Sequence, residues 1–397
     1  MLAGVGHGGI VKVDDRPSTV IHCARRSRPP REIHETVKRQ RNRMSSKTIS
    51  YAALHRFASS AFARVGMSEA DSVTGADVLA TTDAWGVFTH GTKSLAGYLR
   101  RLKAGGLRAQ GKPRIVAEGG GWATVDGDSS LGMITSVFAM QTALTKARQQ
   151  GIAYVGVRNS CHFGAAGYYA WLAAREGLIG ISMANDIPSV AAPGSRGAVT
   201  GSNPLAYAVP AGKHRPMLLD ISTATVAGGK VYAAKARGES IPGNWIIDAT
   251  GKPTTDLSGF PHSCALLPMS GHKGYGLALL IETLSGILSG AAVTWGVRSW
   301  AHQDATLPTL HGAAFLAIDV KCIAPPEEFV RKVEALIDEI HDSPRADDVD
   351  RLLVPGELEW ERHDRAMKEG IALPVDVVGN LKIAAELAGL DQPVLTD

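Results

Sequence analysis

Four polar, glycine-rich blocks carry the side chains that could do chemistry in this sequence. They are Thr89-His90-Gly91, residues 159–167, Asp220-Ile221-Ser222 and residues 271–276. Two of the histidines in these blocks, His90 and His162, are candidates to exchange a proton near neutral pH. The glycines free backbone N–H groups, and Lys273 adds a positive charge beside them. Together these blocks predict a site that binds an anionic cofactor and moves a proton.

Each of these residues also has an ordinary structural interpretation. His90 could cap a helix or lie at the surface, and His162 could be a buried histidine satisfied by the backbone. Asp220 could cap a turn, and Lys273 could be solvated. On the functional side, small residues after His162 would let a ligand approach a helix N-terminus, and a carboxylate at a strand end could accept ribose hydroxyls. No single block is specific.

Several other chemistries find little support in the residues. No HxH, HExxH or Cys/His cluster predicts a metal site, and no GxSxG elbow predicts a hydrolase. The GxGxxG pattern at residues 4–9 has only three residues before it. Because that pattern binds dinucleotides only between a strand and a helix, we interpret this match as coincidence.

The charge is concentrated in the first 43 residues. The 397-residue chain has a formal net charge of +4, but residues 1–43 contain ten Lys/Arg and four Asp/Glu. The rest is close to neutral, without the basic stripe typical of nucleic-acid binders, so we predict no nucleic-acid partner. Binding of nucleic acid through the tail stays as a minor alternative. The composition is 45% hydrophobic and 20% charged, which fits a globular protein of two or three packed units.

The cysteines and the apolar segments bear on location. Four cysteines are widely spaced without a CxxC pair, which favours a reducing compartment. No apolar signal region opens the chain. The most apolar long stretch, 274–297, contains Glu282 and many small residues, so we expect buried helical structure and not a membrane span. We therefore predict a cytoplasmic protein with no membrane partner.

The elements that must position the site alternate between helix and strand. Apolar periodicity predicts helices at 46–65, 95–102, 136–149, 167–175 and 328–340. A further helix is predicted to begin after Ser68, which is a good N-cap. Strands are expected at 123–126, 152–157 and 179–183. The segment 343–397 is polar and expected to be mostly helical. Residues 1–43 lack a sustained pattern, so we expect a disordered extension before a plausible start at Met44. The alternation predicts an α/β middle domain.

Taken in order, the blocks resemble the malate/L-lactate dehydrogenase family, from about residue 46 to residue 390. The resemblance also rests on residues 201–204, a Gly-Ser-Asn-Pro turn, and on Ile241-Pro242 with Trp245 and Asp248. It implies an α/β fold whose NAD(P)-binding domain is not a Rossmann domain, flanked by helical parts from both chain ends, and a homodimer. We therefore expect an N-terminal helical part at 44–120, the NAD(P)-binding domain at 121–320, and a C-terminal helical part at 321–397 that packs with the N-terminal part.

The same resemblance implies an NAD(P)-dependent 2-hydroxyacid dehydrogenase/reductase. The family includes ureidoglycolate, sulfolactate and piperideine-2-carboxylate oxidoreductases, which move a hydride between nicotinamide and C2 of a 2-hydroxy acid, 2-oxo acid or related imino acid. His90, oriented by Thr89, would be the acid/base, with His162 as the alternative. NAD or NADP would be lined by His162, Phe163, Gly164, Ala165, Ala166, Asp220, Ile221, Ser222 and Lys273. A non-catalytic nucleotide-binding member is the alternative function.

Three positions depart from the family pattern. The family often has arginine at positions 85 and 94 and aspartate at 88, where this chain has Trp85, Ser94 and Phe88. A serine does not replace a bidentate arginine clamp on a substrate carboxylate, although Lys93 is adjacent. We therefore place Lys93 and Ser94 beside a small anionic substrate, and expect that substrate to be bulkier or less acidic than malate or lactate.

Overall fold

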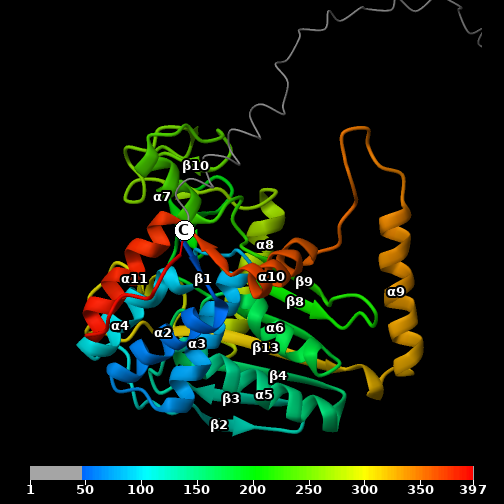
Figure 1. The fold of residues 1–397 in the computed structure, drawn as a ribbon. Coiled ribbons are helices and arrows are strands. Elements are labelled where there is room, and N and C mark those ends of the chain that lie inside the picture. Colours follow the sequence, from blue (N-terminus) through cyan, green and yellow to red (C-terminus); the bar gives the residue numbers. More distant parts are fainter. Residues whose placement is uncertain (1–46, 397) are drawn as a thin grey trace, which may run out of the picture. The chain divides into compact units, whose positions relative to one another are not determined.

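The computed structural model describes residues 47–396, and residues 46–397 group into one compact unit. At its centre is a seven-stranded sheet (Figure 1) in the order β2-β3-β4-β13-β5-β8-β9. The strands β3 and β4 are parallel, and all other neighbours in this sheet are antiparallel. The strand bounds are β2 Arg114–Glu118, β3 Trp122–Asp126, β4 Ile152–Ser160, β5 Leu178–Ala184, β8 Leu205–Val209, β9 Met217–Ile221 and β13 His311–Asp319.

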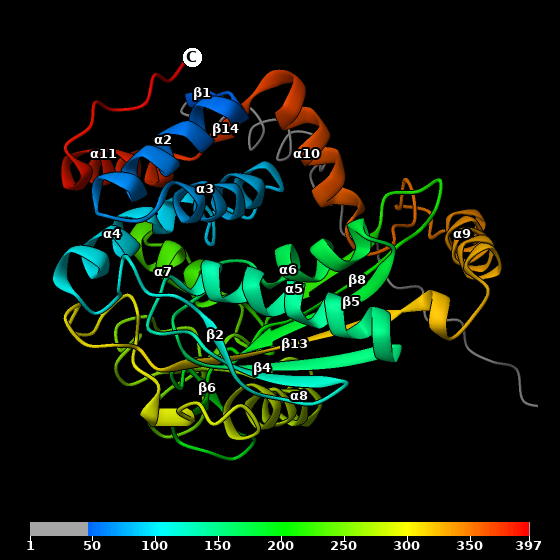
Figure 2. The same ribbon diagram turned by 90° about the horizontal axis from the view of Figure 1, so that it is seen from below.

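Helices cover both faces of this sheet. Figure 2 shows α5 (Gly132–Gln150) and α6 (Ala166–Arg175) on one face and α8 (His272–Glu282) on the other. Small residues allow the close approach: a Cβ atom at Gly180 of β5 would overlap the carbonyl oxygen of Ala170 in α6. The predicted strands at 123–126, 152–157 and 179–183 and helices at 136–149 and 167–175 fall within β3, β4, β5, α5 and α6, which confirms the α/β class.

The two ends of the described chain pack together. Strand β1 (Lys47–Ile49) pairs antiparallel with β14 (Ile371–Leu373), and Thr396 bridges to Thr48 (Figure 1). The helix α11 (Val375–Ala388) contacts α2 (Tyr51–Arg64) and α4 (Leu95–Ala104). The remaining helices here are α3 (Glu69–Ala84), the 3-10 turn η1 (Thr92–Ser94) and α10 (Glu357–Glu369). The domain boundaries at 120 and 320 stay predictions.

Several predicted boundaries need comment. Ser68 caps α3 as expected, its Oγ accepting the N–H of Asp71. The helix predicted from residue 46 is wrong at its start, because residues 47–49 form β1 and Ser50 is the N-cap of α2. The disordered extension, the start at Met44 and the GxGxxG match lie outside the described residues.

The apolar stretch 274–297 is less buried than predicted. The α-helix α8 ends at Glu282 and is followed directly by a π-helical turn, η2 (Thr283–Ile287). The 3-10 turn η3 (Thr294–Gly296) comes later in the same stretch. The outer side of the stretch is exposed: Leu280 is 53% and Ile287 65% accessible. Within residues 47–396, no helix has the length and apolarity needed to cross a membrane.

A smaller five-stranded sheet borders the site, in the order β11-β10-β12-β6-β7. Its hydrophobic core joins Ile246 and Leu266 to Val231 and Ala234 of the helix α7 (Gly228–Arg237). Outside both sheets, α9 (Pro326–Asp342) contains the predicted helix 328–340. The short strands are β6 Val190–Ala191, β7 Ala198–Thr200, β10 Ile246–Ile247, β11 Pro253–Thr254 and β12 Ala265–Leu266, and a 3-10 turn, η4, spans Val320–Cys322.

Candidate active site

A cavity of about 2410 Å³ opens between the main sheet, the smaller sheet and the N-terminal helices. Its walls bring together loops that are far apart in sequence, among them parts of the segments 85–90, 161–166, 184–189, 218–222, 227–233, 299–303 and 353–359. Three of the four predicted blocks, those at His90, His162 and Asp220, therefore meet at one cavity.

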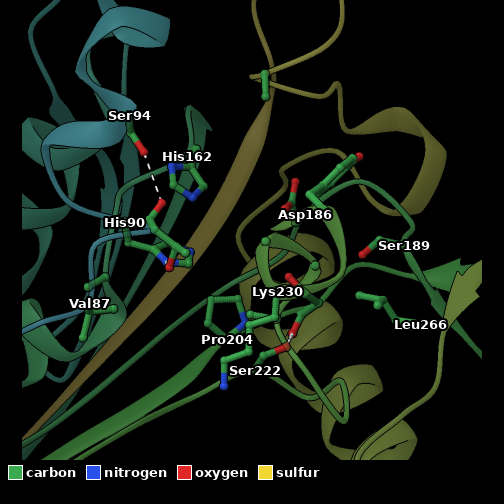
Figure 3. A pocket seen from close by; sticks show the side chains of 18 of the residues that line it. Val87, His90, Ser94, His162, Asp186, Ser189, Pro204, Ser222, Lys230 and Leu266 are labelled. Carbon is green, nitrogen blue, oxygen red and sulfur yellow. Dashed lines mark hydrogen bonds between the residues drawn. The ribbon is translucent and has the colours of Figure 1, made fainter. Parts of the chain in front are cut away.

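The two predicted histidines lie beside each other in this cavity. The rings of His90 and His162 stack with centroids 5.5 Å apart, and Figure 3 shows both on one side of the pocket. Nδ1 of His90 lies 2.9 Å from Oγ1 of Thr89, the contact predicted to orient the ring. Burial lowers the pKa of both histidines, to about 3 for His162, where His90 lowers it further. Both rings are thus neutral near pH 7 and able to accept a proton.

His162 is held by aromatic side chains that the sequence did not single out. Oη of Tyr98 lies 2.6 Å from Nδ1 of His162. The indole of Trp300 stacks on the His162 ring at 4.5 Å and 18°. With Nδ1 engaged by Tyr98, Nε2 is the ring nitrogen that has no protein partner among residues 47–396. The ring is fixed at Nδ1 and open at Nε2, and Nε2 can accept a proton in the tautomer whose Nδ1–H donates to Oη of Tyr98.

Across the pocket from the histidines lies a carboxylate, Asp186 (Figure 3). Its Oδ1 lies 3.1 Å from Nε2 of His311, which is 2% exposed. Burial alone would raise the pKa of Asp186, but the hydrogen bond and charge of His311, together with His162, hold that pKa below its usual range. Asp186 is therefore an anion, and its charge opposes the effect of burial on His90 and His162.

A buried polar network fixes the loop that carries Asp186. Oδ1 of Asn203 accepts the N–H of Asp186 at 3.1 Å, and Nδ2 of Asn203 donates to Glu282 at 2.8 Å. Glu282 also accepts from Asn185 and from the N–H of Thr294. The Gly-Ser-Asn-Pro turn at 201–204 thus connects the cavity to α8.

Eight of the predicted cofactor residues line the cavity, from the loop between β4 and α6, the start of α6 and the end of β9: His162, Phe163, Gly164, Ala165, Ala166, Asp220, Ile221 and Ser222. The helix α6 begins after Ala165 with no side-chain cap, and Oδ2 of Asp220 accepts the N–H of Gly167 at 2.7 Å. Asp220 is exposed to the cavity, and its partial desolvation by the surrounding walls raises its pKa to about 6, with a further contribution from Glu359. Small side chains that let a ligand approach the backbone, and a nearby carboxylate, fit the phosphates and hydroxyls of a dinucleotide.

Lys273 is placed differently from the other predicted cofactor residues. It lies exposed in the first turn of α8 and is not among the residues that line this cavity. Lys273 therefore lies outside the walls of this cavity, and its contact with the cofactor stays a prediction.

The predicted substrate residues line the cavity but have partners of their own. Nζ of Lys93 pairs with Asp376 of α11 at 2.7 Å, and Oγ of Ser94 donates to the carbonyl of Thr89 at 3.4 Å. Phe88 faces the cavity. Trp85 borders the same cavity but is only 2% exposed, and it packs edge-on against Trp171 and Trp360. The tryptophan at position 85 is therefore part of the core.

Comparison with known proteins places the chain in a family. The family model described as malate/L-lactate dehydrogenase matches residues 49–382. Malate dehydrogenase of Pyrococcus horikoshii is 36% identical over 335 residues, 83% of this chain and 92% of that protein. The solved structure of that enzyme has a TM-score of 0.79 at 34% identity, covering 87% of this chain and 97% of its own.

Two further relatives differ in the substrate that they are named for. L-sulfolactate dehydrogenase of Methanocaldococcus jannaschii is 37% identical over 328 residues, 83% of this chain and 93% of that protein. Ureidoglycolate dehydrogenase (NAD(+)) of Escherichia coli strain K12 is 32% identical over 332 residues, again 83% and 93%.

An α/β fold whose cavity combines oriented histidines with room for a dinucleotide defines a nicotinamide-dependent oxidoreductase. The chain belongs to the malate/L-lactate dehydrogenase family. It is a dehydrogenase that uses NAD or NADP, which confirms the predicted family, enzyme class and cofactor type. The comparisons give no support to the non-catalytic alternative.

Proposed function

We propose that this dehydrogenase acts at C2 of a 2-hydroxy acid, or of the matching 2-oxo or imino acid, beside His90 and His162. The observation that carries the proposal is the stacked pair of His90 and His162 in a cavity of about 2410 Å³, where Nε2 of His162 has no protein partner among residues 47–396. Small-molecule sites usually occupy about 300–1,000 Å³. The larger volume leaves room for a dinucleotide together with a substrate.

The cofactor would lie along α6 and β9. The small residues Gly164 to Ala166, before and at the start of α6, would let the pyrophosphate approach the backbone, and Asp220, which already accepts the N–H of Gly167, would also accept a ribose hydroxyl. When bound, the nicotinamide supplies the hydride acceptor or donor. The residues of the chain do the rest: they orient the substrate, exclude water and hold the proton.

The contacts favour His162 as the group that exchanges the substrate proton, although the sequence favours His90. Tyr98, which holds His162, is buried, whereas Thr89, which holds His90, is exposed. In the oxidation direction, Nε2 of His162 would accept the proton of the C2 hydroxyl, and the anionic Asp186 would stabilise the ring cation that results. His90 would then donate or accept a hydrogen bond to the same oxygen.

The substrate of this enzyme would carry an anionic group and a bulkier or less acidic remainder than malate or lactate. Two observations support this proposal. Ser94 stands where the family often has an arginine, and the neighbouring cation, Lys93, is paired with Asp376. Phe88 and Trp300 add apolar surface to the cavity wall.

One experiment tests cofactor and substrate together. The full-length protein is titrated with NADH and with NADPH, following nicotinamide fluorescence, and is then assayed against malate, lactate, sulfolactate, ureidoglycolate and cyclic imino acids. We expect tight binding of one cofactor and the highest kcat/KM for a substrate other than malate or lactate. A best kcat/KM for malate or lactate would contradict the substrate proposal, and no binding of either cofactor would contradict the site. Lys273→Ala is included, because unchanged cofactor binding would remove Lys273 from the site.

The role of each histidine is tested by substitution with asparagine. His162→Asn should lower kcat by about 10²–10⁴-fold, the usual contribution of general acid–base catalysis, while cofactor binding changes little. His90→Asn should raise KM more than it lowers kcat. If His90→Asn instead abolishes turnover and His162→Asn keeps it, the two roles are exchanged.

The predicted homodimer and cytoplasmic location are further proposals. The exposed apolar side chains Leu279, Leu280, Ile287, Leu288 and Trp295, on α8, η2 and η3, form a surface suited to a second copy. Light scattering of the wild type should then give a dimer, and Leu280→Asp with Ile287→Asp should give a monomer. Val394→Asp, which changes an exposed apolar residue elsewhere that is 85% accessible, is the control. A monomeric wild type would overturn the proposal, and cell fractionation tests the location.

A further inference from the structure

The loop of residues 299–307 is tied to α4 through one buried side chain. Arg101 is 1% exposed and donates to four backbone carbonyls of this loop, those of Ser299, Trp300, Gln303 and Leu307, at 2.5–3.1 Å. Within residues 47–396, no carboxylate forms an ion pair with Arg101. A buried guanidinium is costly unless its donors are satisfied, so these carbonyls and the cation hold each other in place.

The same helix, α4, also provides the surface on which the side chain of Trp300 packs. Gly97, one turn before Arg101, lies under the indole, and a Cβ atom there would come within 2.8 Å of Cζ3 of Trp300. The ring of Tyr98 stacks on the indole of Trp300 at 5.0 Å and 19°. Residues 97, 98 and 101 are neighbours on one side of a helix. Helix α4 thus fixes the backbone of Trp300 through Arg101 and its side chain through Gly97 and Tyr98.

The indole placed in this way lies against His162. Trp300 stacks on His162 at 4.5 Å, and Tyr98 reaches Nδ1 of the same ring. The stack on Trp300 and the hydrogen bond with Tyr98 therefore fix the plane and the rotation of the imidazole. Because Trp300 covers the ring, it also keeps water away from it.

From these contacts we infer that Arg101 and Trp300 are positioning residues of the dehydrogenase: Arg101 holds the 299–307 loop so that Trp300 packs on His162 and presents its Nε2 to the substrate. The inference rests on the proposed role of His162. The gain from such positioning is kinetic, since small errors in the placement of a proton acceptor reduce turnover strongly. Neither residue touches the proton that moves.

Three variants of the full-length protein separate positioning from simple structural support. Trp300→Ala removes the stack, Trp300→Phe keeps a flat ring, and Arg101→Lys keeps a cation with fewer and differently directed donors. We expect Trp300→Ala to lower kcat about 10-fold or more at constant cofactor affinity, since positioning errors act on turnover. Trp300→Phe should restore most of the activity, and Arg101→Lys should lie between wild type and Trp300→Ala.

A readout that does not need turnover is the titration of His162, followed by NMR of the protein labelled at histidine Cε1 and assigned with His162→Asn. Trp300→Ala should raise the pKa of His162 toward its ordinary value, because water reaches the ring, and the pH profile of kcat should move in the same direction. Arg148→Lys, which changes a partly exposed arginine paired with Glu176, should change neither.

The outcomes separate this inference from the proposed function. A folded Trp300→Ala protein with an unchanged His162 titration and unchanged kcat would overturn the inference. Loss of folding in both Trp300→Phe and Arg101→Lys would also overturn it, because the residues would then serve stability alone. Failure of the wild type to bind NADH or NADPH would contradict the proposed function, whereas the His162 titration would still report on Trp300.

Discussion

Gly91 lies directly over the carboxylate of Asp83, so closely that a Cβ atom at position 91 would overlap Oδ1 of Asp83. Asp83 is 1% exposed, and its Oδ2 accepts hydrogen bonds from the N–H and the Oγ1 of Thr92 at 3.0 and 2.5 Å. The turn that carries His90 is thus fixed to α3 by the hydrogen bonds between Thr92 and Asp83. Glycine is required here because of the close approach of a side chain, and not because of a positive φ.

Gly91→Ala should therefore damage both the fold and the site. Overlap with Asp83 must be relieved by moving the turn, which we expect to cost about 1–3 kcal/mol of unfolding free energy and to shift His90. Urea unfolding and kcat/KM measure the two effects. Gly379→Ala is the matched control, since a Cβ atom there meets nothing within 4 Å and alanine favours its helix α11. Equal stability of the two variants would contradict the contact.

Asp83 should also make stability depend on pH. Burial raises its pKa to about 7, more than the bonds from Thr92 lower it, against an ordinary value of 3.8. Between these values the folded state binds more protons than the unfolded chain. The contribution of this group is therefore complete below about pH 4 and is lost as the pH rises to about 7.

Asp83→Asn removes this titration and keeps an oxygen for Thr92. Between pH 5 and pH 7 the wild type should lose unfolding free energy relative to the variant, with a slope of at most about 1.4 kcal/mol per pH unit. Parallel stability curves over this range would show that Asp83 is ionised in the folded protein.

The ion pair between Lys93 and Asp376 leads to a prediction about substrate affinity. Its side chains are 33% and 58% exposed, and such pairs contribute about 0–1 kcal/mol to stability. Asp376→Asn should leave the melting temperature nearly unchanged while it frees Lys93 to face an anionic substrate. We expect KM to fall a few-fold and kcat to stay constant. A higher KM would instead show that Asp376 itself contacts the substrate.

The sequence predicted the core elements well, because their patterns are local. Short, nearly continuous apolar runs indicate β4 and β5, and Ser68 marks the start of α3 by capping chemistry. The strand β1 was missed, since its pairing with β14 is set by residues more than 300 positions away. The exposed side of α8 was taken as buried, because periodicity alone does not tell whether an apolar face is covered within the chain.

Of the residues that line the cavity, those in three of the four predicted blocks were singled out from the sequence, whereas Lys273 of the fourth block lies outside it and the residues held by tertiary contacts were not singled out. Asp186 follows the end of a buried strand, β5, and that position was a usable signal. Tyr98 and Trp300 look like ordinary core aromatics in the sequence, and only their contacts with His162 give them a role. His311 could not be recognised from the sequence for the same reason, because its position opposite Asp186 depends on the pairing of β13 with β5.

Asn203 offers the sharpest test of how the Asp186 loop is supported. It is fully buried, its φ of 30° lies in a region that asparagine tolerates better than most residues, and it joins Asp186, Ala278 and Glu282 by hydrogen bonds. Alanine would leave the N–H of Asp186 and one oxygen of Glu282 without these partners.

Asn203→Ala should therefore lower the unfolding free energy by about 2–4 kcal/mol, since each buried group left unsatisfied costs about 1–3 kcal/mol. It should also lower kcat, because Asp186 loses the hydrogen bond that sets its backbone opposite the histidines. Asn244→Ala, at an exposed position outside the cavity, controls for the loss of an amide side chain. If Asn203→Ala reduces stability but kcat is unchanged at a temperature where the variant is folded, the network supports the fold without positioning Asp186.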